Sequence, residues 1–301
     1  MAQGVAVATR REELEGILAF GRSAESPYLV HLQSEFSIAN YIRIADDVAR
    51  RARRLGVGTG KASPPAVLDW GAGYGQLSYL LAGRGCAVTS YDVGEPGTFP
   101  LPICPAMPII RDDHPSRLPF ADVRFDVVVS CGVLEHVPDL PALMTNCLAL
   151  LKTGGEMHVE VPYEAAPTAW QDPTHVRAMN ENSWLYYTDW FWYLGWFEHR
   201  FQPTASGWLD LALNPCAKEQ AAFMKLVLKK VETTPAERTQ ARTFQPELRL
   251  PDDAVPAALR YAGAGSDDAG TISALASAAR TTSGEFHIST SRMERLAGAS
   301  A

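Results

Sequence analysis

The spacing of hydrophobic residues changes along the chain and separates three regions. Residues 1–60 carry apolar side chains at intervals of three and four, which predicts a helical segment that could cap an acceptor site. Residues 61–232 alternate short apolar runs with helical patterns. In residues 233–301 the composition shifts toward Ala, Ser, Thr, Gly and Pro, which predicts a weakly structured tail or a small cap.

The middle region holds β-branched and apolar runs that are mostly separated by helical stretches. The predicted strands are 66–69, 87–91, 109–110, 125–130, 156–161, 205–213 and 222–231, and the predicted helices in this region are 76–84 and 140–151. Strands separated by helices form βαβ units with right-handed crossovers. We therefore expect an α/β fold with a mainly parallel sheet.

Residues 163–203 interrupt this alternation and are dense in aromatic residues from Trp184 to Phe201. One interpretation is a buried helix that packs on the sheet, and this is the one we favour. The other is a lid over an acceptor, in which Tyr187 or Trp192 stacks on a ring or sugar face. Tyr28 and His31, in the N-terminal segment, are weaker candidates for contacts with the acceptor.

Composition and charge narrow the function classes. The formal net charge of −7 provides no general attraction to nucleic acid. The sequence has no run of about 20 apolar residues, so no membrane span is expected. Five cysteines without a CxxC pair argue against a disulfide framework and favour a reducing cytoplasm. Residues 1–11 lack the features of a secretory signal.

A glycine turn follows the first predicted strand, with Gly71, Gly73 and Gly75 in GxGxG spacing. Glycines allow a ligand to approach the backbone closely, and the following helix offers free N–H groups. The spacing differs from the GxGxxG pattern of dinucleotide sites, and no Lys-Ser/Thr follows as in a P-loop. Asp69 lies two residues before the turn, and Asp92 lies 21 residues after Gly71, where an acid can accept ribose hydroxyls.

This segment and four later motifs together resemble the class I S-adenosylmethionine-dependent methyltransferases. The motifs are Leu118-Pro119-Phe120, Phe125-Asp126-Val127-Val128-Val129, Val133-Leu134-Glu135-His136-Val137 and Leu150-Leu151-Lys152-Thr153-Gly154-Gly155. The resemblance covers about residues 66–162, in the family's order. It implies a Rossmann-like, doubly wound, mainly parallel seven-stranded sheet with an N-terminal helical segment and a C-terminal tail. It also implies S-adenosylmethionine as cofactor and S-adenosylhomocysteine as product.

The resemblance further implies a set of cofactor-binding residues. Gly71, Ala72 and Gly73 would line the methionine part with Asp69 near its amino group, Asp92 would hold the ribose, and Cys131 and Gly132 would pass the cofactor at the rim of the sheet. An acid before the Leu-Pro-Phe motif would approach the adenine amino group. Asp112 and Asp113 are the candidates, and we prefer Asp113.

Two histidines are candidates for removing a proton from the acceptor. His136 belongs to the Leu-Glu-His-Val motif, where it could alternatively order the loop. His175 follows the fifth long strand, in a region that commonly builds the acceptor pocket in this fold, and Asp172 could orient its imidazole. The alternative is a loop fastened by its own hydrogen bonds. Asp172 and His175 could also serve as two metal ligands, but no third partner has suitable spacing, so no metal is predicted.

The sequence therefore predicts methyl transfer to the oxygen of a small-molecule hydroxyl, such as a sugar, a glycan or a natural product. The segment Asp172-Pro173-Thr174-His175-Val176-Arg177 resembles one found in methyltransferases of sugars and cell-surface glycans. The alternatives are a small-molecule N-methyltransferase and a noncatalytic scaffold of the same fold. For partners we expect a small-molecule acceptor, no nucleic acid and no membrane span, with homodimer formation left open.

Overall fold

The computed structural model describes residues 10–23, 31–56, 63–93, 103, 109–112, 120 and 123–244. The chain divides into two compact units, residues 1–233 and residues 234–301. The second unit contributes the helix α5 (Pro235–Phe244), and the rest of the predicted tail lies outside the described residues. None of the helices in these ranges is both long and apolar enough to cross a membrane.

The first unit is built on one mixed sheet of eight strands in the order β3-β2-β1-β4-β5-β8-β6-β7. The strands are β1 (Ala66–Trp70), β2 (Ala87–Val93), β3 (Ile109–Asp112), β4 (Phe125–Cys131), β5 (Leu151–Pro162), β6 (His199–Leu209), β7 (Pro215–Cys216) and β8 (Phe223–Glu232). The first five run parallel, and β8, β6 and β7 pair antiparallel. The α/β, mainly parallel fold is confirmed, and the strand count exceeds the expected seven by the two-residue strand β7.

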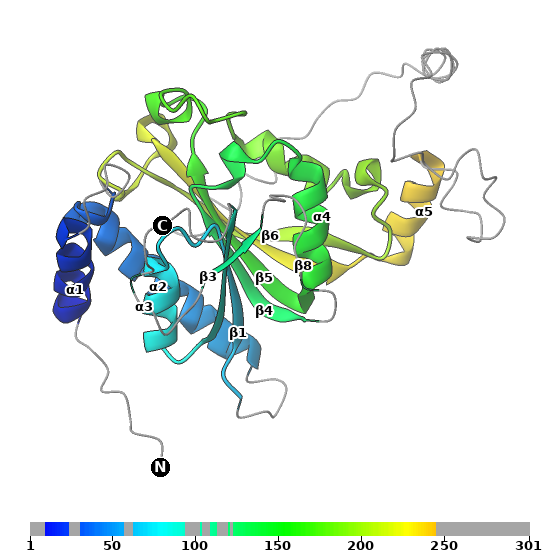
Figure 1. Ribbon diagram of the computed structural model, residues 1–301. Coiled ribbons are helices and arrows are strands. Elements are labelled where there is room, and N and C mark those ends of the chain that lie inside the picture. Colours follow the sequence, from blue (N-terminus) through cyan, green and yellow to red (C-terminus); the bar gives the residue numbers. More distant parts are fainter. Residues whose placement is uncertain are drawn as a thin grey trace. The chain divides into compact units, whose positions relative to one another are not determined.

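Helices cover both faces of this sheet. The helices α1 (Arg10–Ser23), α2 (Glu35–Gly56) and α3 (Gln76–Gly83) lie on one side, and α4 (Leu140–Leu150) lies on the other (Figure 1). The predicted N-terminal helical region is thus two helices. Helix α2 buries Ile38, Ile42 and Ala45 against the core, which explains the spacing of its apolar residues.

Two sequence predictions about the second half of the sheet need correction. Strand β6 begins at His199, six residues earlier than expected, because the register shifts between Pro203 and Ala205 and interrupts the alternation of its side chains. The aromatic segment is not one buried helix. It forms the short 3-10 helices η5 (Glu181–Tyr187) and η6 (Phe191–Leu194), and the second ends where Gly195 has a φ of 73°.

The aromatic side chains of this segment nevertheless contribute to the core. Trp184, Tyr187, Phe191 and Trp196 are buried, and Tyr187 and Trp196 have ring centroids 6.0 Å apart. The aromatic residues are therefore buried, as expected, although they do not lie on one long helix. Short 3-10 turns let rings that are close in sequence point in several directions, which a single helix face would not allow.

Candidate active site

A cavity of about 360 Å³ opens at the carboxyl ends of β1, β2 and β4. Its lining includes seven of the eight predicted cofactor residues: Asp69, Gly71, Ala72, Gly73, Asp92, Cys131 and Gly132. The eighth, Asp113, lies outside the described residues. Ligands of open parallel sheets bind at this edge, because the strands end there and the connecting loops diverge.

The glycine turn forms the floor of this cavity. The N–H groups of Gly71 and Ala72 both donate to the carbonyl oxygen of Tyr91, at 2.8 and 3.0 Å, so the turn is fixed to the end of β2. Gly71 has a φ of +85°, and a Cβ added there would lie 2.2 Å from Cγ2 of Val133. A side chain at this position would meet both backbone strain and a steric clash, which explains the glycine.

Asp92 stands at the end of β2 and faces this turn. Its carboxylate accepts hydrogen bonds from the N–H groups of Gly73 and Val93, the latter at 2.7 Å. Carboxylates that accept backbone N–H groups form strong, charge-assisted bonds that hold the side chain in one orientation. Asp92 therefore presents a fixed carboxylate at the cavity, as a ribose-binding acid requires.

Asp69 is the most deeply buried acid in the cavity lining, with 2% of its surface exposed. The hydroxyl of Ser78 donates to its Oδ2 at 2.6 Å, and Ser90 in turn donates to Ser78 at 2.7 Å. Burial, together with the nearby charge of Asp92, raises the pKa of Asp69 to about 7. A cationic group in the cavity would favour the ionised form of Asp69, which fits the amino group of a methionine moiety.

Sequence reasoning missed several residues of the cavity. Tyr41 reaches it from α2, and burial raises the pKa of its phenol. Gln76 begins α3, and its buried Oε1 has no hydrogen-bond partner among the residues that the structure describes. Its place directly after the glycine turn was a signal that could have identified Gln76. No local signal identifies Tyr41, because only the packing of α2 on the sheet brings it there.

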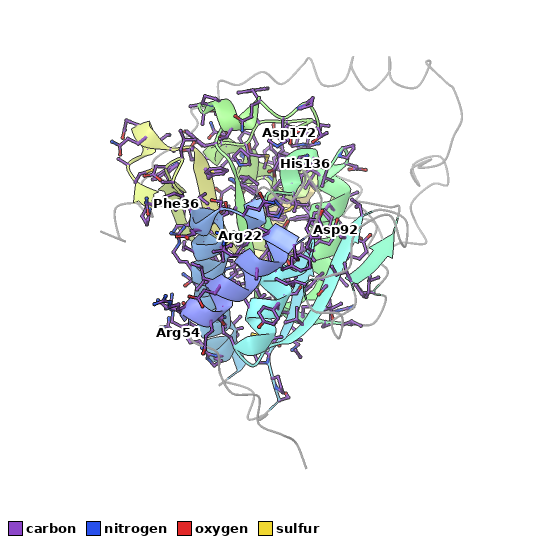
Figure 2. All side chains as sticks on the ribbon, turned by 60° about the vertical axis from the view of Figure 1, so that its left-hand side comes forward. Arg22, Phe36, Arg54, Asp92, His136 and Asp172 are labelled. Atoms are coloured by element: carbon purple, nitrogen blue, oxygen red, sulfur yellow. The ribbon has the colours of Figure 1, made fainter. Side chains whose placement is uncertain are left out.

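The two candidate histidines lie together beside this cavity, although they are far apart in sequence. His136 belongs to the 3-10 helix η3 (Leu134–His136) and lines the cavity. The loop that carries His175 is fastened to the same region, because the N–H of Val176 donates to the carbonyl of Glu135 at 2.9 Å. Arg177 donates from Nη2 to the carbonyls of Val137 and Pro138, at 2.6 and 2.7 Å. In Figure 2, His136 lies between Asp92 and Asp172.

Hydrogen bonds fix the orientation of both imidazoles. The Thr174 hydroxyl donates to Oδ1 of Asp172 at 2.7 Å, so its oxygen is free to accept from Nδ1 of His136, 2.9 Å away. Nδ1 of His175 lies 3.0 Å from the carbonyl of Ala169 and donates to it. In this assignment both Nε2 atoms keep their lone pairs. Burial and the neighbouring His175 lower the pKa of His136, which favours its neutral form.

This arrangement changes the expected role of Asp172. Its Oδ2 is 3.9 Å from Nε2 of His175, too far for a hydrogen bond, whereas Oδ1 accepts from the N–H and the hydroxyl of Thr174. These hydrogen bonds from Thr174 lower the pKa of Asp172. Asp172 therefore orients His136 through Thr174, and the carbonyl of Ala169 orients His175. Asp172 and His175 thus meet across the turn, but no direct hydrogen bond joins them, and the loop is fastened by the hydrogen bonds of Asp172 to Thr174.

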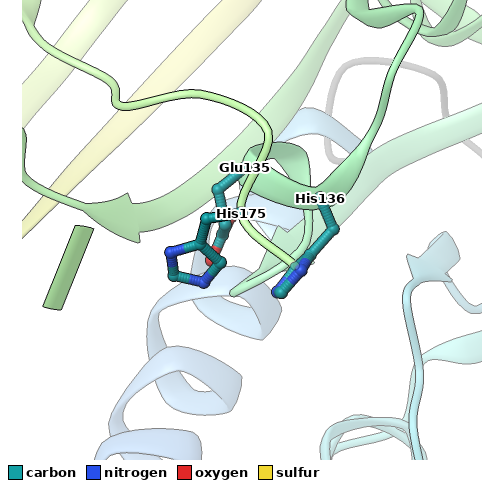
Figure 3. Close-up of side chains that lie close together, drawn as sticks. All are labelled: Glu135, His136 and His175. Atoms are coloured by element: carbon teal, nitrogen blue, oxygen red, sulfur yellow. The ribbon is translucent and has the colours of Figure 1, made fainter. Parts of the chain in front are cut away.

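Glu135 lies next to the two histidines and is 2% exposed (Figure 3). Its Oε2 has no hydrogen-bond partner within the described part of the chain. Burial is the main cause that raises the pKa of Glu135 to about 7, and the charges of Asp172 and Glu160 raise it further. One potential ligand atom from each of Glu135, His136 and His175 lies within 4.8 Å of the other two. This is the third partner that the sequence did not indicate.

The other predicted acceptor residues are placed differently. His31 lines the cavity, where its ring centroid lies 6.3 Å from that of Tyr41. Tyr187 is buried among aromatic residues and Trp192 is half-buried, and neither lines this cavity. Tyr28 lies outside the described residues.

Comparisons with known proteins bear on the family to which this chain belongs. Residues 40–204, more than half of the chain, match the family model described as "Methyltransferase domain". A ubiquinone biosynthesis O-methyltransferase of Azotobacter vinelandii is 37% identical over 99 residues, which cover 30% of this chain and 41% of that protein. Its counterpart in Idiomarina loihiensis is 34% identical over 103 residues, which cover 30% of this chain and 40% of that protein. The matches thus span about two fifths of these relatives.

A solved structure with a similar fold is the 1,6-didemethyltoxoflavin-N1-methyltransferase of Burkholderia thailandensis. It is 19% identical with a TM-score of 0.43, and the match covers 77% of this chain and 93% of that one. At this TM-score the comparison supports no conclusion about this chain. The family model, by contrast, spans the glycine turn, Asp92 and both histidines. The chain therefore belongs to the class I S-adenosylmethionine-dependent methyltransferases.

Proposed function

We propose that this protein transfers the methyl group of S-adenosylmethionine to a hydroxyl oxygen of a small molecule. The glycine turn at Gly71 lets the cofactor approach the backbone closely. The fixed carboxylate of Asp92 accepts the ribose hydroxyls, and buried Asp69 attracts the methionine amino group. These three features account for cofactor binding at the edge of the sheet.

The observation that carries the proposal is the histidine pair beside the cofactor cavity. His136 lines that cavity, and its ring centroid is 4.6 Å from that of His175. A hydroxyl held against these residues is close to the cofactor and can give its proton to the Nε2 atom of one of the two imidazoles. Its oxygen then attacks the methyl carbon in line, a C–O bond forms, and the C–S electron pair returns to sulfur to give S-adenosylhomocysteine. Much of the rate would come from this placement.

The named relatives support oxygen as the acceptor atom. The first matches are called ubiquinone biosynthesis O-methyltransferases, although each match covers only part of their length. The chain's net charge of −7 favours a small molecule over a nucleic acid. We therefore expect a sugar, a phenol or another natural product that carries a hydroxyl group.

Calorimetric titration with S-adenosylmethionine and S-adenosylhomocysteine tests the cofactor first. Release of S-adenosylhomocysteine is then measured with hydroxylated sugars, with phenols, and with amines of matched shape. We expect binding of both cofactor forms and turnover with a hydroxyl acceptor. A protein that binds neither form is a scaffold, and one that methylates only the amines is an N-methyltransferase. Either result would refute the proposal.

Substitution of His175 tests the role of the histidine pair. We expect His175→Ala to reduce turnover strongly while cofactor affinity changes little, because His175 does not line the cofactor cavity. His199, on β6, is a matched control, since its Nε2 contacts only the hydroxyl of Thr153 in the structure's hydrogen-bond network. Equal turnover in His175→Ala, His199→Ala and the wild type would remove His175 from the reaction.

A further inference from the structure

We propose that Glu135, His136 and His175 bind a divalent transition-metal ion beside the cofactor cavity. One carboxylate oxygen and two imidazole nitrogens form a donor set that suits ions such as Zn²⁺, Mn²⁺ or Fe²⁺ rather than Mg²⁺ or Ca²⁺, which prefer oxygen donors. Three protein ligands leave coordination positions open for an exogenous group, as catalytic metal sites do. Figure 3 shows the three side chains next to one another.

The distances allow one ion to contact all three groups. Their ligand atoms lie within 4.8 Å of one another. Donor atoms about 2.0–2.2 Å from a metal are separated by roughly 3–3.5 Å, so the most distant pair must approach by about 1.5 Å. Rotation of the Glu135 carboxylate, whose Oε2 has no hydrogen-bond partner among the described residues, can supply such a movement while both imidazoles keep their hydrogen bonds. The loop and η3 are already joined by backbone and Arg177 hydrogen bonds.

The hydrogen bonds around the cluster favour metal binding at the correct atoms. Histidine ligands of metals usually donate their second ring N–H to a carbonyl, a carboxylate or a polar group, which fixes the tautomer. Here Nδ1 of His175 is held by the carbonyl of Ala169, and Nδ1 of His136 by the hydroxyl of Thr174. Both Nε2 atoms are left to bind an ion. Asp172 completes this outer layer, since it accepts the hydroxyl proton of Thr174.

The burial of Glu135 independently supports the binding of a cation at this cluster. Its side chain is 98% buried, and Oε2 has no hydrogen-bond partner among the described residues. A carboxylate in such a place costs free energy unless a cation or a donor satisfies it. An ion held with the two histidines would satisfy Oε2 where no described protein group does. The cluster therefore has both a suitable set of donors and an unsatisfied acid.

The site gives the acceptor a specific position, and this step rests on the proposed function. An ion at the cluster lies beside His136, which lines the cofactor cavity, so its open positions can take the acceptor's hydroxyl oxygen. Coordination lowers the pKa of a bound hydroxyl, as it does for water. With an ion bound, the hydroxyl proton would pass to solvent, and the histidines would act as ligands of the ion rather than as proton acceptors. Acceptors with two adjacent oxygens would bind best.

Metal binding is measured directly, apart from activity. The full-length protein is freed of metal with a chelator and titrated with Co²⁺, whose visible absorption reports its ligands, and then with Zn²⁺ by calorimetry. We expect one ion per chain. Glu135→Gln and His175→Ala should each abolish the Co²⁺ spectrum of the site, and His199→Ala should retain it. Absence of binding, or equal binding by wild type and His175→Ala, would overturn the inference.

A substitution in the outer layer tests the geometry without removing a ligand. Thr174→Val removes the hydroxyl that accepts from Nδ1 of His136 and leaves the longer contact with the Thr174 carbonyl, at 3.3 Å, so we expect metal affinity to fall by about 10–100-fold. Thr174→Ser keeps that oxygen and should restore the affinity. Methyl transfer is measured in parallel with chelator and with added Zn²⁺ or Mn²⁺. Full turnover under chelator would refute a role for the ion in the reaction and leave the proposed function intact, whereas Co²⁺ binding without any methyl transfer would refute only the proposed function.

Discussion

Replacement of Gly71 by Ala should disable the cofactor site through two separate effects. The φ of +85° costs an alanine about 1–2 kcal/mol, because its Cβ approaches the following carbonyl. The same Cβ would lie 2.2 Å from Cγ2 and 3.0 Å from Cγ1 of Val133. Overpacking of this kind typically costs about 1–3 kcal/mol. Together these effects predict a loss of about 2–5 kcal/mol in the free energy of unfolding.

Gly85 is a matched control for the backbone effect alone. It has a φ of +80°, and a Cβ added there meets nothing within 4 Å. We expect Gly85→Ala to cost only about 1–2 kcal/mol and to leave cofactor affinity unchanged, since Gly85 does not line the cavity. The excess cost of Gly71→Ala then measures the overlap with Val133. It should shrink in a Gly71→Ala, Val133→Ala double variant.

Urea unfolding of the three variants and the wild type gives the free energies of unfolding, and the slopes are compared to confirm that each transition exposes the same surface. Calorimetric titration with S-adenosylhomocysteine gives the cofactor affinity. Equal destabilisation by Gly71→Ala and Gly85→Ala would refute the steric part of the reasoning. Unchanged cofactor affinity in Gly71→Ala would refute the assignment of the glycine turn to the cofactor.

Substitution of three charged residues of the site should change three different properties: cofactor affinity, the pH dependence of stability, and turnover. Asp92→Asn keeps the shape of the side chain but removes its charge, and calorimetry should show cofactor affinity reduced by about tenfold or more, whereas unchanged affinity would contradict a ribose contact. Because burial raises the pKa of Asp69 to about 7, its contribution to stability is complete below the unfolded-state pKa and is lost as pH rises through the folded-state value of about 7. Urea midpoints of the wild type should therefore fall relative to Asp69→Asn between about pH 4 and about pH 7 and level off above that range, and parallel curves would contradict this. Arg177→Met should lower turnover more than cofactor affinity, because Arg177 ties the His175 loop to Val137, and equal losses in both would argue against that role.

The residues proposed to bind the cofactor could be grouped from the sequence because each lies at a position that the order of the strands defines. Each lies at the end of a parallel strand or in the turn after it, and parallel strands end at the same edge of the sheet. Asp69, Gly71 and Asp92 needed only the correct order of strands to meet. Tyr41 could not be found in this way, because it reaches the cavity through the packing of α2 on the sheet.

The aromatic segment shows why burial is easier to predict than shape. The apolar surface of Trp184, Tyr187 and Phe191 requires that they be covered, and they are. Their backbone depends on local hydrogen bonds, which composition does not reveal. Asn180 and Ser183 cap the first turn, and the left-handed Gly195 ends the second. The same aromatic content would be compatible with a helix if those turns were absent.

The histidine cluster depends on a different kind of information. Spacing alone pairs Asp172 with His175, since the two lie three positions apart. The structure instead places Thr174 between Asp172 and His136. This division separates an outer layer that orients His136 from an inner group of Glu135, His136 and His175, whose possible ligand atoms lie within 4.8 Å of one another. That division depends on the docking of the loop against η3, which joins residues about forty positions apart. We therefore expect the proposed acceptor chemistry to need the loop after β5 and the turn after β4 together, and substitutions that separate them should lower turnover before they lower cofactor affinity.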